Sequence, residues 1–183
     1  MNPDLRELIE ELRTDLEADQ PASLSWAQID AGAPDARIPA DVPEPVRDLL
    51  AVADGVLAGA FDLAGTAHIA YRQAMLADMP AFTGVGATPA AWYFLGTLME
   101  EPVLLRRDTG AVWWFPQTSG DPYYAREEFE ELMPNLEYFL AYYVFGPGYA
   151  DVGFEDDEWW GFLDEHDLTT VPGEGDEDEE GGA

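Results

Sequence analysis

The sequence of 183 residues contains no cysteine and no lysine, and only two histidines. Without cysteine, disulfides, thiolate nucleophiles and cysteine-ligated zinc or iron–sulfur sites are excluded. Without lysine, Schiff-base chemistry and the lysine of a phosphate-binding P-loop are excluded. His68 lies in an apolar run, where we expect a packed or strand-edge residue, and His166 lies among acids, where we expect a surface residue. We therefore predict that the protein is not an enzyme.

Long apolar runs are also missing. No stretch approaches the roughly 20 apolar residues that a membrane-spanning helix needs. The first residues, Met1-Asn2-Pro3-Asp4, lack the basic and apolar regions of a signal peptide. The sequence predicts a cytoplasmic protein that does not bind membranes.

Charge is strongly one-sided. Eight arginines stand against 38 acids, which gives a net charge of −30, and residues 121–183 hold 20 of the acids and one arginine. Such a field repels nucleic acid and anionic lipid and attracts cationic surfaces. An alternative is that the charge serves solubility, or reflects an acid-rich proteome. The runs 155–158 and 176–180 lack the spacing of a calcium-binding loop, so we expect no metal site and no cofactor.

Aromatic and aliphatic residues gather in three short central runs, Trp92–Met99, Val103–Arg107 and Ala111–Phe115. Asp108-Thr109-Gly110 separates the last two runs, and turn residues between apolar runs indicate a β-hairpin. A three-residue loop would place Leu105 opposite Trp113. One face would then carry Val103, Leu105, Trp113 and Phe115, and the other Leu104, Arg106, Val112 and Trp114.

Helix signals flank this sheet region. Asn2 as the N-cap and Pro3 at the first position predict a helix that continues to about Ala18, within an N-terminal segment 1–19. Glu44-Pro45 begins a second predicted helix, with Val46, Leu49, Leu50 and Ala53 on one face and Gly55 at its end. Ala70–Met79 predicts a short helix that ends at Pro80.

The last third of the chain alternates helix signals with acidic stretches. Glu127–Met133 predicts one or two helical turns, and Asn135 caps a further predicted helix. In Phe154–Leu163 we expect Trp159, Phe162 and Leu163 to fold back on the body. We predict one domain over residues 1–172, with an acidic aromatic extension at 149–172, followed by a disordered acidic tail at 173–183.

The order of these parts resembles the SUKH superfamily, which includes bacterial immunity proteins and yeast cell-wall-assembly regulators. The resemblance rests on three features between residues 38 and 145. They are Ile38-Pro39 followed by Pro45, Leu49-Leu50 and Asp54-Gly55; the hairpin L-L-R-R-D-T-G-A-V-W-W-F; and the late segment F-E-E-L-M-P-N-L-E-Y-F-L. It implies an α+β fold with a single curved, mostly antiparallel sheet packed against helices. It also implies no catalysis, because bacterial members commonly neutralise a toxin by binding it.

Charge and resemblance together favour a non-catalytic immunity protein that binds a cationic toxin domain, possibly a nuclease, through an acidic surface. The residues predicted to contact the partner are Glu155, Asp156, Asp157, Glu158, Trp160 and Trp114. Tryptophan beside a charged rim is a common arrangement at interface hot spots. The alternative is a regulatory or scaffold module that binds a cellular partner, with no toxin involved.

Overall fold

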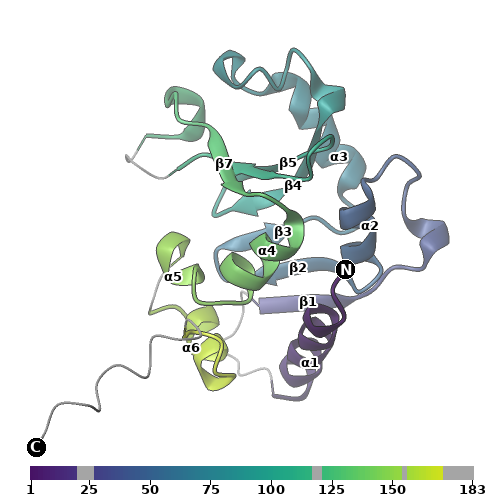
Figure 1. Cartoon of the computed structure of the whole chain (residues 1–183), viewed down its shortest axis with the longest axis vertical. Helices are drawn as coiled ribbons and strands as arrows, with labels where there is room; N and C mark the ends of the chain where they lie inside the picture. Colours follow the sequence, from purple (N-terminus) through teal and green to yellow (C-terminus); the bar gives the residue numbers. More distant parts are fainter. Residues whose placement is uncertain (20–26, 117–120, 154–155, 171–183) are drawn as a thin grey trace, which may run out of the picture.

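A single open sheet of seven antiparallel strands organises the protein (Figure 1). The computed structural model describes residues 1–19, 27–116, 121–153 and 156–170. Each strand pairs with the next one along the chain, so the sheet is a meander. The strands are β1 (Ala27–Ala31), β2 (Ala53–Ala58), β3 (Phe61–Leu63), β4 (Trp92–Leu98), β5 (Glu101–Arg106), β6 (Val112–Trp114) and β7 (Glu130–Met133). The structure confirms the predicted α+β class and the antiparallel sheet.

Six α-helices pack around this sheet within the described residues. They are α1 (Pro3–Asp19), α2 (Glu44–Leu50), α3 (Ile69–Ala74), α4 (Leu136–Phe139), α5 (Tyr149–Val152) and α6 (Glu158–Glu165). A π-helical turn at Leu140–Val144 extends α4, and 3-10 turns occur at Asp35–Arg37, Met75–Asp78, Ala81–Thr83, Pro89–Ala91 and Tyr123–Ala125. In the described ranges, no helix is long and apolar enough to cross a membrane.

The two faces of the sheet bury two separate cores. Successive residues of a strand point to opposite faces, so Tyr93 and Leu95 of β4 enter the larger core, whereas Trp92 and Phe94 enter the smaller one. Side chains from α1, α2, α4, α5 and α6 complete the larger core. The smaller core is mainly aromatic and is completed by residues 75–91, which lie at the end of the molecule opposite α6 (Figure 1).

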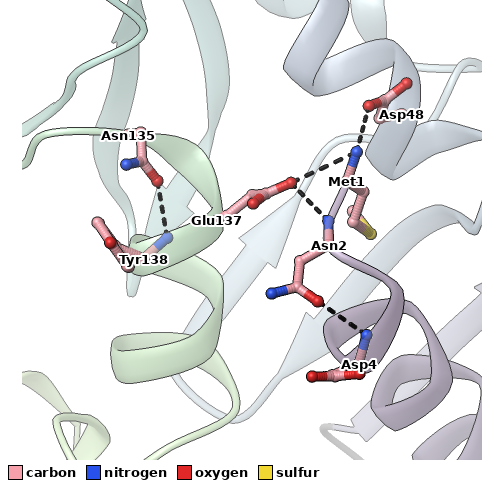
Figure 2. Close-up of polar contacts among 7 residues, drawn as sticks. All are labelled: Met1, Asn2, Asp4, Asp48, Asn135, Glu137 and Tyr138. Atoms are coloured by element: carbon pink, nitrogen blue, oxygen red, sulfur yellow. Dashed lines mark hydrogen bonds and ion pairs between the residues drawn. The ribbon is translucent and has the colours of Figure 1, made fainter.

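The N-terminus is tied to two helices that are distant in sequence. As predicted, Asn2 caps α1: its Oδ1 accepts a hydrogen bond from the Asp4 N–H at 2.8 Å. The Met1 amino group forms ion pairs with Asp48 of α2 and with Glu137 of α4, the latter at 3.4 Å (Figure 2). The hydrogen bond to Asp48 is the main cause that raises the pKa of this amino group above its usual value. These contacts hold α1, α2 and α4 together at one end of the larger core.

The predicted register of the central hairpin is wrong by one residue. The loop has four residues instead of three: the Arg106 N–H donates to the Ala111 carbonyl at 2.8 Å, and Gly110 adopts a φ of 79°. Leu104 therefore pairs with Trp113 and Leu105 with Val112. A slip of one residue moves every side chain of a strand to the opposite face. Trp113 consequently packs against the smaller core, which contains Trp92, whereas Leu105 lies in the larger core.

Two further local predictions are wrong for tertiary reasons. Glu130–Met133, predicted as helical, is strand β7, because it pairs with β6 along the edge of the sheet. Ala53 and Gly55, predicted on and at the end of the second helix, belong to β2, where Gly55 has a φ of 115°. The predicted tail at 173–183 lies outside the described residues.

Candidate partner-binding surface

Asp157, one of the predicted surface acids, accepts hydrogen bonds from two internal groups. It is the N-cap of α6, and its Oδ1 accepts a hydrogen bond from the Trp160 N–H at 2.8 Å. Its Oδ2 accepts a hydrogen bond from the Tyr149 hydroxyl, which itself accepts one from the Ala60 N–H at 2.9 Å. Burial, and then the contact with Asp157, raises the pKa of Tyr149 well above its usual value. Asp157 thus connects α6, α5 and the turn between β2 and β3.

The tryptophans of α6 have different environments. Trp159 is 1% exposed, and its Nε1 donates to the Val144 carbonyl at 2.9 Å. Phe162 and Leu163 are also buried, so the prediction that this segment folds back on the body is confirmed. Trp160 is half-buried, with its ring stacked 6.5 Å from the Tyr149 ring. Trp160 therefore offers a partner only part of its side chain.

The predicted contact residues differ in how far they are exposed. Asp156 and Glu158 are exposed beside Trp160 and are available to a partner. Asp157 is half-buried and engaged as described above, and Glu155 lies outside the described residues. Trp114 is half-buried on β6, where it packs against the larger core and pairs with Glu130. Because of the register shift, Trp114 lies on the opposite face from Arg106, not on the face predicted.

The two histidines lie in different environments, one on each side of the chain's central strands in sequence. His68 is exposed just before α3, so it is neither packed nor at a strand edge, as had been predicted. His166 is half-buried, with its Nε2 3.7 Å from a carboxylate oxygen of Asp15. Within the part of the chain that the structure describes, no three His, Asp or Glu side chains are grouped to hold a metal ion.

Two hollows lie beside β2 and β3, on the side of the sheet away from the larger core. The first, of about 480 Å³, includes Asp62 and Arg72, which are paired at 2.7 Å. The second, of about 340 Å³, includes Asp54, whose carboxylate accepts hydrogen bonds from the backbone and side chain of Thr66. Most of the acidic groups here already have internal partners, so these hollows are weaker candidates for recognition than the surface at α6.

Sequence reasoning missed a second group of aromatic and acidic residues, at the 3-10 turn Tyr123–Ala125. Tyr124 is 67% exposed there, and Glu127 and Glu128 are exposed just after the turn. Arg126 instead is 5% exposed: it forms an ion pair with Glu101 and donates to the Pro116 carbonyl. The adjacent pair Tyr123-Tyr124 was the available signal, but the sequence could not show that the Tyr124 ring is exposed whereas Tyr123 packs on Phe115.

No protein-family model matches this chain, and no curated protein matches it. The resemblance to the SUKH superfamily therefore stays a prediction based on the quoted motifs. The charge of the chain and the exposure of its acidic and aromatic side chains support the function proposed below.

Proposed function

We propose that this protein is a non-catalytic immunity protein of the SUKH type, which binds and neutralises a cationic toxin domain in the cytoplasm. The observation that carries the proposal is the net charge of −30, combined with exposed carboxylates beside the half-buried ring of Trp160 at the start of α6. Asp156 and Glu158 supply the exposed charge, and Trp160 supplies apolar area next to it.

The physical basis is electrostatic complementarity. A nuclease toxin needs a cationic groove to hold phosphates, and an acidic protein that occupies this groove excludes the substrate. Opposite charges also steer the two proteins together, so association is fast at low salt and slower at high salt. Neutralisation by binding requires no catalytic group.

The test is a neutralisation assay with the product of the adjacent gene. That protein is expressed in a host with and without this chain, and the complex is then isolated by pull-down at low and high salt. We expect protection of the host and a complex that weakens as salt increases. Absence of both protection and complex would contradict the proposed function.

Variants that remove acidic charges test which part of the protein contacts the partner. The pair Asp156→Asn and Glu158→Gln should slow association, because both carboxylates are exposed. Asp164→Asn and Glu165→Gln, exposed acids near the other end of α6, are the matched control for loss of the same charge. Equal effects of the two pairs would show that overall charge, and not the start of α6, determines binding.

A further inference from the structure

The exposed rings of Phe82 and Tyr124 are connected through Phe115 and Tyr123, near the 3-10 turn Tyr123–Ala125. Among the described residues, the large apolar side chains classed as exposed are Tyr71, Phe82, Tyr124 and Tyr138. Phe82, 42% exposed, packs edge-to-face on the buried Phe115 at 6.2 Å, and Tyr123 packs on the same ring at 5.0 Å. Tyr123 in turn contacts Tyr124 at 5.5 Å. We call Phe82, Tyr123 and Tyr124 the aromatic patch.

A buried ion pair fixes the position of this patch. Arg126 follows the turn directly, and its guanidinium reaches inward to Glu101 of β5 and to the Pro116 carbonyl. A second oxygen of Glu101 is buried and lacks a hydrogen-bond partner in the described part of the chain. Burying a charge pair with incomplete hydrogen bonding is costly. The arrangement therefore positions a surface turn more than it stabilises the fold.

The charge around the patch restricts what can bind it. Residues 121–131 contain five acids (Asp121, Glu127, Glu128, Glu130 and Glu131) and one cation, Arg126. Because Arg126 is buried against Glu101, the outer surface of this segment is strongly negative. A second copy of the same chain would bring like charges together. The complementary occupant is a cationic protein surface.

We propose that the aromatic patch, with Glu127 and Glu128 beside it, binds arginine side chains on a cationic partner protein. The inference rests on the proposed function, since it gives the cationic partner a second contact surface besides the start of α6. Arginine fits better than lysine, because a planar guanidinium stacks on aromatic rings while it pairs with carboxylates. An ammonium ion pairs with the carboxylates but is more strongly hydrated and stacks less well.

The test compares two defined probes, an octa-arginine and an octa-lysine peptide, by isothermal titration calorimetry on the full chain. We expect octa-arginine to bind more tightly. The double variant Phe82→Ser/Tyr124→Ser should weaken octa-arginine binding about tenfold and reduce the preference over octa-lysine. The double variant Tyr71→Ser/Tyr138→Ser removes two exposed rings elsewhere and should change neither affinity by more than about twofold. None of these substitutions alters the net charge.

Two results would overturn the inference: equal affinity of the wild-type chain for both peptides, or equal losses in the two double variants. If Phe82→Ser disturbs folding, the single variants Tyr124→Ser and Tyr138→Ser make the same comparison. Failure here leaves the neutralisation assay unaffected, because that assay measures protection and not the arginine preference. Conversely, a selective patch without protection would contradict the proposed immunity function alone.

Discussion

Two turns of this protein combine aromatic rings with carboxylates, and the structure uses them in opposite ways. At the start of α6, Asp157 is engaged internally and Trp159 is 1% exposed, so that turn mainly anchors the helix. At Tyr123–Ala125 the adjacent Arg126 is buried, at 5% exposed, whereas the ring of Tyr124 is 67% exposed. Similar composition therefore yields, in one place, a helix anchor beside the exposed Asp156 and Glu158 and, in the other, a turn that exposes an aromatic ring. What differs is which side chain receives an internal partner.

The largest expected effect comes from removing the buried cation of the second turn. Arg126→Met leaves Glu101 without its cation, and we expect the free energy of unfolding to fall by about 3–5 kcal/mol. Urea denaturation followed by circular dichroism measures the change. The double variant Arg126→Met/Glu101→Leu removes both charges and should recover most of the loss. If the double variant is no more stable than the single one, the ion pair does not explain how this turn is held.

A smaller effect is expected when the anchor of α6 is removed. Asp157→Ala takes away the helix cap and the acceptor of the Tyr149 hydroxyl, which should lower the free energy of unfolding by about 1–2 kcal/mol. The neighbouring Asp156→Ala changes the charge equally, but its side chain is exposed, and it should cost less than about 0.5 kcal/mol. Chemical denaturation of both variants provides the comparison. Equal costs would show that Asp157 has no special structural role.

The smallest effect is a pH dependence of the same anchor. Because the pKa of Tyr149 is raised in the folded state by burial and by Asp157, its stabilising contribution is complete below about pH 10 and is lost as the pH rises further. For one tyrosine the loss at pH 10.5 is at most about 0.8 kcal/mol. Tyr149→Phe should show a shallower decline in stability between pH 9 and 10.5. An identical decline in the wild-type protein and in Tyr149→Phe would show that Tyr149 does not cause it, since Tyr93 and the remaining tyrosines are present in both.

Local sequence signals predicted structure correctly where the neighbouring residues alone determine it. The cap at Asn2, the cap at Asn135 and the burial of Trp159 with Phe162 and Leu163 follow from nearest neighbours and helical periodicity. The antiparallel hairpin was also predicted, because apolar runs on each side of a turn need no distant partner. Its register was not, since Asp108-Thr109-Gly110 is compatible with loops of three and of four residues.

Strand β7 and the second turn could not be predicted in this way. Glu130–Met133 has good helix-forming residues, and it becomes a strand because the edge of β6 accepts a pairing partner. Trp160 was predicted as a partner contact because acids flank it, and Trp114 because of its predicted face of the hairpin, yet both are half-buried. The exposed rings of Phe82 and Tyr124 are far apart in the sequence and are connected through Phe115 and Tyr123.

By itself, the sequence determined the α+β class, the main helices and the strongly negative field, because periodicity, caps and charge are summed along the chain. Only the tertiary structure decided which acids and rings reach the surface. That choice depends on partners from distant segments: Glu101 draws Arg126 inward, and Tyr149 and the N-terminus of α6 engage Asp157. Packing decides which side chains are exposed. Charge and aromatic content therefore indicate the kind of partner but not which surface of the protein binds it.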